Sequence, residues 1–222
     1  MSDFTQNMRN ASQEKDLIES LVSRTHFKKP EIEALIKHYK RLVTCASYTS
    51  TNRRGLMDRT IFRDFLLQQF QMTDDIFMDR VFRAFDTDNN SYVSEEEWVT
   101  GMSVFLRGTV QERVKFCFTV YDLNQDGYIS REEMFHVLKN SLLKQASDED
   151  PDEGIKELVD IALKALDQDH DNRISFLDFE NSNKKDKYTL VMELLGPCLP
   201  QDCLRDAYEA TYCAPANKQP FA

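Results

Sequence analysis

A stretch of twelve residues that begins at Asp122 carries oxygen-bearing side chains at alternate positions. Asp122, Asn124 and Asp126 occupy positions 1, 3 and 5, Gly127 occupies position 6, and Glu133 occupies position 12. Side chains at positions 1, 3 and 5 point into one turn, glycine permits a sharp bend, and the long glutamate reaches back with two oxygens. Because Ca²⁺ takes about six to eight oxygen ligands, this pattern predicts a calcium-binding loop.

The same spacing recurs in loops that begin at Asp86 and Asp167, so the chain contains a repeat. Apolar residues flank each loop at helical spacing, which places every loop between two amphipathic helices. Position 7 offers a backbone carbonyl and position 9 often binds through a water molecule. The predicted metal ligands are Asp86, Asp88, Asn90, Tyr92, Ser94, Glu97, Asp122, Asn124, Asp126, Tyr128, Ser130, Glu133, Asp167, Asp169, Asp171, Arg173, Ser175 and Asp178.

The three loops differ in ways that affect affinity. Ser91 stands where glycine is usual, and a left-handed backbone costs a non-glycine residue about 1 kcal/mol. Asn172 tolerates this conformation better. Asp178 at position 12 is one methylene shorter than glutamate, which favours a weaker Ca²⁺ site or competition by Mg²⁺. Three aspartates at positions 1, 3 and 5 of that loop add negative charge, which favours tighter binding of a cation. The sequence therefore leaves open whether the short Asp178 side chain or the added charge decides the affinity of this loop.

A fourth, degenerate copy lies upstream. With Thr49 as its first residue, the metal positions hold Thr49, Thr51, Arg53 and Thr60, so no carboxylate is present. We therefore expect a helix–loop–helix unit without an ion. Position 8 of every loop is apolar and is expected to form a bridge between partner loops, and these residues are Leu56, Val93, Ile129 and Ile174.

The pattern predicts an all-α fold with two lobes of paired helix–loop–helix units and a hinge at residues 107–109. The predicted N-terminal lobe spans 1–107 and contains units at about 36–70 and 74–106. The predicted C-terminal lobe spans 108–222 and contains units at about 109–145 and 153–185. A helical extension over 188–213 follows these two units. Helices are expected over about 12–25, 30–46, 58–70, 74–85, 95–106, 111–121, 131–145, 153–166 and 176–184, with further pieces from 188 and over 201–210. Residues 145–154 form an acidic linker, either a solvated connector or a partner-contact loop.

Composition excludes several classes of function. The 222 residues carry a net charge of −10, which argues against nucleic acid as the main partner. No apolar run is long enough to span a bilayer, and the polar N-terminus does not resemble a secretory signal. Position 2 is Ser and not Gly, so no N-myristoyl lipid anchor is expected.

The cysteines and histidines suggest neither a zinc site nor a catalytic pair. Five cysteines at irregular spacing fit a reduced intracellular compartment. A zinc site using Cys198 and Cys203 has no histidine at ligand spacing. Because no nucleophile–base pair or glycine-rich phosphate loop is present, we expect a protein that is not an enzyme.

Calcium binding has a predicted mechanical consequence. The position-12 carboxylate lies on the helix that leaves the loop, so drawing it towards the ion moves that helix and opens the helix pair. Apolar residues then either face a target helix or remain plain core, and these are Phe82, Trp98, Met102, Phe118, Met134 and Leu138.

With one disabled loop, three intact loops and a C-terminal extension, the chain resembles the neuronal calcium sensor branch of the EF-hand proteins over about residues 30–200. It lacks the myristoylation signal and the Cys-Pro pair of the first loop that are usual there. It is more closely similar to the ciliary calcium sensors of outer-arm dynein over residues 72–75, 78–83, 105–108, 139–145, 149–156 and 196–200.

This second resemblance implies a cytoplasmic protein of the axoneme in cilia and sperm flagella. It implies binding to an outer-arm dynein heavy chain, to other dynein or docking subunits, and indirectly to axonemal microtubules, with calcium-dependent control of bending. The alternatives are a regulatory subunit of another target and a calcium buffer.

Overall fold

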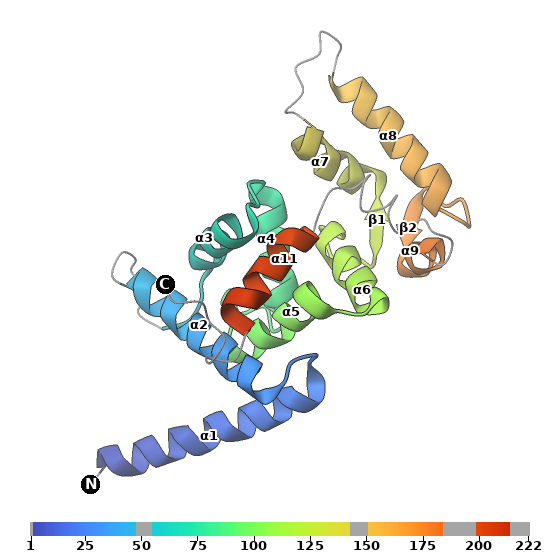
Figure 1. Ribbon diagram of the computed structural model, residues 1–222. Helices are drawn as coiled ribbons and strands as arrows, with labels where there is room; N and C mark the ends of the chain where they lie inside the picture. Colours follow the sequence, from blue (N-terminus) through green and yellow to red (C-terminus); the bar gives the residue numbers. More distant parts are fainter. Residues whose placement is uncertain (1, 48–54, 143–150, 184–198, 214–222) are drawn as a thin grey trace. The chain divides into compact units, whose positions relative to one another are not determined.

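Figure 1 shows a computed structural model that describes residues 2–47, 55–142, 151–183 and 199–213. Within these ranges the chain is mostly helical, and its sheet consists of two short strands. The predicted all-α fold is therefore confirmed. No helix in the described ranges is both long and apolar enough to pass through a membrane.

The first compact unit comprises Met1–Phe70, Phe85–Gly108 and Asp202–Ala222. Its elements are α1 (Ser2–Arg24), α2 (Lys29–Ser47), α3 (Arg59–Phe70), α5 (Glu95–Arg107), α11 (Asp202–Tyr208) and the π-helical turn η1 (Glu209–Cys213).

The second unit comprises Gln71–Ala84 and Thr109–Gln201. Its elements are α4 (Asp75–Phe85, except its last residue), α6 (Val110–Tyr121), β1 (Tyr128–Ser130), α7 (Arg131–Leu142), α8 (Pro151–Leu166), β2 (Arg173–Ser175) and α9 (Phe176–Asn183).

This division differs from the predicted lobes 1–107 and 108–222 in two places. Most of α4 packs with the second unit, because Arg80 Nη1 donates to the Leu123 carbonyl at 2.6 Å and the ring of Phe77 meets that of Tyr121. The C-terminal segment, which was expected in the C-terminal lobe, packs with the first unit. Sequence spacing finds the helices but not the partners of their apolar faces.

Trp98 is the centre of the first unit's core. It is fully buried, and its ring lies edge-on to Phe65 at 4.6 Å and to Phe62 at 6.4 Å. Gly101, one turn further along α5, faces the ring of Phe85, and a Cβ there would collide with it. The glycine therefore permits the close approach of Phe85 to α5.

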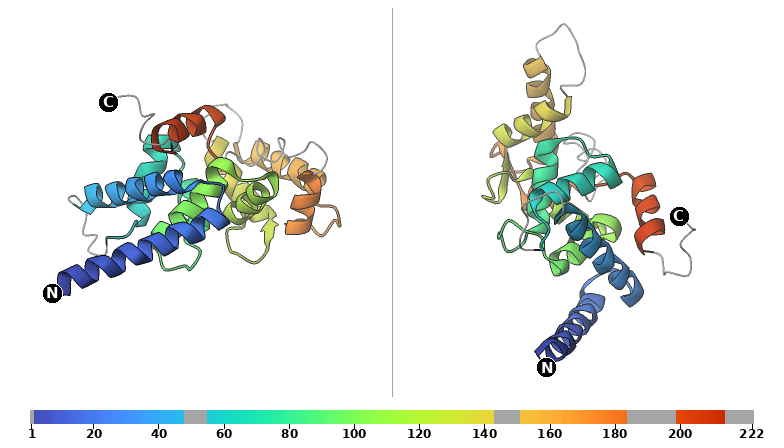
Figure 2. Two further views of the ribbon diagram at one scale, coloured as in Figure 1. Left: turned by 60° about the horizontal axis from the view of Figure 1, so that its bottom comes forward. Right: turned by 90° about the vertical axis from the view of Figure 1, so that its left-hand side faces the viewer.

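The C-terminal segment, which we define as α11 and η1, packs on α2 and α3 (Figure 2). The ring of Tyr212 stacks on His38 at 3.9 Å and 3°, and the Tyr208 hydroxyl lies 2.9 Å from His38 Nδ1. The Tyr208 ring also contacts Phe65 and Phe70. These aromatic contacts explain why this segment belongs to the first unit.

Arg107, the last residue of α5, ties the same segment to α2. Its Nε donates to Glu209 at 3.0 Å and its Nη2 to Glu31 at 2.9 Å. The guanidinium lies 4.9 Å above the ring of Phe27. Burial lowers the pKa of Arg107, but the hydrogen bonds from its two carboxylate partners outweigh burial and raise the pKa above its usual value.

The predicted hinge contains a helix cap. The Thr109 hydroxyl accepts from the amide of Glu112, whose carboxylate accepts from the amide of Thr109, so α6 begins with a capping box. At the predicted linker 145–154, α8 begins with Pro151 and the last four residues are helical, whereas 145–150 lies outside the described residues. The helix expected from residue 188 also lies outside them.

The apolar residues that were expected either to face a target helix or to form core are buried in this structure. All six are at most 7% exposed, namely Phe82, Trp98, Met102, Phe118, Met134 and Leu138. The plain-core interpretation therefore describes this conformation.

Candidate metal centre

The loop that begins at Asp86 brings three carboxylates together. Oxygens of Asp86, Asp88 and Glu97 all lie within 4.8 Å of one another. Asp86 is buried and accepts from the backbone amide of Ser91 at 2.9 Å. Glu97 Oε1 accepts from the amide of Thr87 at 2.9 Å, so the position-12 side chain reaches back to the start of the loop.

The loop that begins at Asp122 has the same framework. Asp122 Oδ2 accepts from the amide of Gly127 at 3.0 Å, and Glu133 Oε1 accepts from the amide of Asn124 at 3.0 Å. Among the described residues, Asp122, Asp126 and Glu133 do not form a carboxylate group as tight as that at Asp86. The other Asp122 oxygen, Oδ1, is buried without a hydrogen-bond partner. A buried, unpaired carboxylate oxygen is what a cation ligand presents before the ion binds, so this donor set fits Ca²⁺.

The loop that begins at Asp167 gathers its carboxylates differently. Oxygens of Asp167, Asp169 and Asp171 lie within 4.8 Å of one another, and Asp178 is not part of this group. Asp178 Oδ2 accepts from the amide of Ser175 at 3.0 Å and from its hydroxyl at 2.6 Å. The short side chain therefore bonds to the end of the loop and, unlike Glu97, shows no bond to its beginning among the described residues.

The predicted position-7 ligands lie at the backbone pairing that joins the loops. Tyr92 stands before the Met57–Val93 bridge, and Tyr128 and Arg173 begin β1 and β2 with their chains extended. Asn90 Oδ1 accepts from the Tyr92 amide at 2.8 Å, which holds position 5 against position 7. Position 6 has positive φ in all three loops, at 69° for Ser91, 86° for Gly127 and 66° for Asn172, as expected.

The degenerate loop has a different register from the predicted one. Met57 and not Leu56 forms the antiparallel bridge with Val93, and Met57 is fully buried. The bridging residue therefore lies one position later than an origin at Thr49 predicts, and the side chain buried there is that of the methionine. Thr49, Thr51 and Arg53 lie outside the described residues, and Thr60 lies in α3.

The family of the chain follows from its similarity to known proteins. The family description "EF-hand domain pair" matches residues 54–102 and again residues 111–182. Calaxin of Xenopus laevis is 53% identical over 203 residues, which cover 91% of this chain and 95% of that protein. Calaxin of Bos taurus is 53% identical over 188 residues (83% and 86%), and calaxin of Danio rerio is 51% identical over 175 residues (79% and 81%). The chain belongs to the calaxin family.

Membership of the calaxin family, with its EF-hand domains, implies Ca²⁺ binding and a regulatory protein. The first matched pair contains the second half of the degenerate loop and the whole loop at Asp86. The second contains the loops at Asp122 and Asp167. The resemblance seen in the sequence is therefore confirmed as membership of the calaxin family, with EF-hand domains.

The pKa shifts of the loop carboxylates indicate why a bound cation would stabilise the loops of this calaxin-family protein. Burial raises the pKa of Asp86 and of Asp122, although backbone amides act in the opposite direction. Burial also acts to raise the pKa of Glu97, but hydrogen bonds led by that from the Ser94 amide outweigh it and lower this pKa. The position-1 carboxylates are thus poorly stabilised as anions by the protein alone, and a bound divalent cation offsets that cost.

Two structural roles in these loops were missed at the sequence level. The position-9 serines cap the following helices: the Ser130 hydroxyl accepts from the amide of Glu133 and donates to its carboxylate. Ser94 makes the same capping box with Glu97. The Ser-x-x-Glu pattern was a sufficient signal for this role. Position 4 also has positive φ, at Asn89, Gln125 and His170, for which no sequence signal was used.

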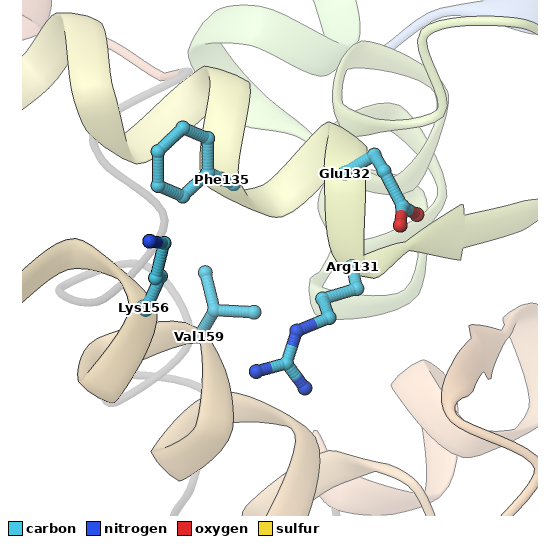
Figure 3. A pocket seen from close by; sticks show the side chains of 5 residues that line it. All are labelled: Arg131, Glu132, Phe135, Lys156 and Val159. Carbon is cyan, nitrogen blue, oxygen red and sulfur yellow. The ribbon is translucent and has the colours of Figure 1, made fainter. Parts of the chain in front are cut away.

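A cavity of about 280 Å³ lies in the second unit between α7 and α8 (Figure 3). Phe135 and Val159 supply apolar lining, and the charged side chains are Arg131, Glu132 and Lys156. Arg131 forms an ion pair with Asp160. The cavity lies beside the exit of the Asp122 loop, outside the predicted metal ligands.

Proposed function

We propose that this chain is a calcium sensor that binds outer-arm dynein in cilia and sperm flagella and regulates motor activity and bending. The observation that carries the proposal is membership of the calaxin family at 53% identity over 91% of the chain. The resemblance of the sequence to ciliary sensors supplies the dynein heavy chain as the partner. The acidic, regulatory character of the chain agrees with a protein partner and not with nucleic acid.

The proposed mechanism uses the position-12 residues. Glu97 and Glu133 lie in the first turns of α5 and α7, so any change in the reach of these carboxylates moves the helix that carries them. Ca²⁺ supplies positive charge and oxygen coordination when bound. The protein's own part is to hold each glutamate by a capping serine while its other oxygen points to the start of the loop.

The proposed partner is tested by measuring binding of the full-length chain to purified outer-arm dynein and to heavy-chain fragments, with Ca²⁺ and with a chelator. The proposal expects calcium-dependent affinity for dynein and a change in dynein-driven microtubule gliding. The matched control is a Glu97→Gln, Glu133→Gln, Asp178→Asn variant, which retains the side-chain volumes but loses three ligand charges. Equal dynein binding with and without Ca²⁺, or none at all, would overturn the proposal.

A calcium buffer and a regulatory subunit of another target remain the competing functions. A sensor exposes apolar surface on binding Ca²⁺, whereas a buffer barely opens. An increase in the fluorescence of a hydrophobic dye on addition of Ca²⁺ therefore excludes the buffer. Location in the cytoplasm and in the axoneme of the cilium or flagellum is proposed with the dynein partner and is checked by immunolocalisation in ciliated cells.

A further inference from the structure

The bridge between the loops of the first unit contains a side chain that belongs to neither loop. The Val93 amide donates to the Met57 carbonyl at 2.8 Å, as in an ordinary antiparallel pair. The reciprocal bond, from the Met57 amide to the Val93 carbonyl, is replaced by a relay. The Met57 amide donates to the hydroxyl of Tyr39 at 3.1 Å, and that hydroxyl donates to the Val93 carbonyl at 2.8 Å.

Among the described residues of the second unit, the two loops pair directly with each other. There Ile129 pairs with Ile174, and the flanking residues pair in register as Tyr128 with Ser175 and Ser130 with Arg173. Three consecutive residue pairs hold these two loops together. In the first unit a single pair and one tyrosine hydroxyl, contributed by α2, perform this task.

The surroundings of Tyr39 make the relay costly to lose. Tyr39 is 2% exposed, and Met57 and Val93 are fully buried. Burial raises the pKa of Tyr39 to about 12, so the hydroxyl stays protonated and is able both to donate and to accept at neutral pH. Without it, one buried backbone donor and one buried backbone acceptor lack partners, and in the closed conformation of the loop both are shielded from water.

Val93 stands next to Tyr92, whose backbone carbonyl is a predicted ligand, and one residue before Ser94, which caps α5. When the loop binds an ion, residues 92–94 must stay in the closed conformation. When no ion is bound, the loop is free to open, and water is able to hydrate the unpaired backbone groups. Loss of the relay therefore penalises the ion-bound loop more than the ion-free loop.

We propose that the Tyr39 hydroxyl is a positioning group for the calcium loop at Asp86, in place of the direct hydrogen bond that an intact partner loop makes. Its hydrogen bond fixes the position of the Val93 carbonyl group and connects the loop to α2. The inference depends on calcium binding at this loop and not on the identity of the partner protein.

The test is a calcium titration of the full-length Tyr39→Phe variant followed by the fluorescence of Trp98, the single tryptophan of the chain. Trp98 lies in the first unit at the start of α5, and the phenylalanine retains a ring beside it. The expected result is a loss of calcium affinity of about 3- to 10-fold at this loop. Calorimetry on the same variant is expected to show unchanged affinity at the two loops of the second unit.

Tyr208→Phe is the matched control. It also removes one buried hydroxyl bond from the first unit, that to His38, but leaves the loops untouched. The proposal expects the Trp98 midpoint of this control to remain at the wild-type value, and faster hydrogen exchange of the Met57 amide only in Tyr39→Phe. A midpoint within about twofold of wild type in Tyr39→Phe, or an equal shift in Tyr208→Phe, would overturn the positioning role and leave only a contribution to stability.

Discussion

The two loop pairs of this calaxin-family protein reach the same geometry by different means. The pair in the second unit joins two acidic loops through three matched residue pairs between β1 and β2. The pair in the first unit joins an acidic loop to the degenerate loop, through the Met57–Val93 bridge and the Tyr39 hydroxyl. We therefore expect the degenerate loop to contribute its backbone, as the pairing partner of the Asp86 loop, and not an ion site.

This difference predicts different calcium responses. Two adjacent sites that share a strand pair influence each other, so binding at Asp122 and Asp167 is expected to be coupled. The loop at Asp86 is expected to have no second site to couple with and to respond alone. We therefore expect one independent site and one interacting pair.

The largest expected loss of calcium affinity comes from neutralising the position-12 glutamate, first in one unit and then in the other. Glu97→Gln and Glu133→Gln each remove one anionic ligand, and we expect a loss of about 100-fold in calcium affinity at the altered loop. Calorimetry gives the number of sites, and Trp98 fluorescence separates the units. Glu97→Gln is expected to abolish the Trp98 response and Glu133→Gln to preserve it. An unchanged number of sites in either variant would contradict the ligand assignment for that loop.

Lowering the pH is expected to reduce the free energy of unfolding of the first unit more than that of the second. His38 is buried, and burial, followed by the nearby charge of Arg41, lowers its pKa to about 4. The unfolded chain has a histidine pKa near 6.5, so as pH falls from about 6.5 towards 4 protons favour the unfolded state, with a loss of the order of 3 kcal/mol. His136 and His170, in the second unit, are exposed.

Thermal unfolding in chelator, followed through Trp98 across this pH range, measures the effect. His38→Gln retains a hydrogen-bonding side chain towards Tyr208 but does not titrate there. The wild-type curve is expected to fall more steeply with acid than that of the variant. Parallel curves would mean that His38 does not control the acid response.

Asp178→Glu tests whether reach limits the third loop. The added methylene lets the carboxylate approach the start of the loop, as Glu97 and Glu133 do in theirs. We expect about a 10-fold gain in calcium affinity at the Asp167 loop and a smaller gain at the coupled Asp122 loop. Competition titrations with Mg²⁺ are expected to show weaker competition in the variant. An unchanged calcium affinity would show that the three aspartates already compensate for the short side chain.

The smallest effect is expected at position 6. Ser91 has a φ of 69°, so Ser91→Gly removes strain of about 1 kcal/mol and raises affinity at the Asp86 loop by about 5-fold. Asn172→Gly is the comparison, because asparagine adopts this conformation more readily and the gain there should be smaller. Trp98 fluorescence and calorimetry follow the respective sites. A larger gain at Asn172 than at Ser91 would reverse the assignment of strain.

The local pattern made the loops and their helices predictable, whereas contacts between distant segments were not. The positive φ of Ser91 and Asn172 follows from position 6 of a twelve-residue loop. Pairing by Met57 in place of Leu56 depends on which side chain the core buries, and spacing alone does not report that. The place of Tyr208 beside His38 joins residues far apart in the chain, so no periodicity reveals it.

The position of the C-terminal segment also bears on how the protein is made. The second unit has all its residues once Gln201 has left the ribosome, but the first unit still lacks the tyrosines that cover His38 and Phe65. Although translation usually lets the N-terminal part of a chain fold first, here we expect the first unit to complete its packing after the second. We therefore expect the aromatic side chains of α2 and α3 that contact Tyr208 and Tyr212 to stay partly uncovered until the C-terminal segment has been synthesised, and nascent-chain proteolysis at successive lengths would test this order.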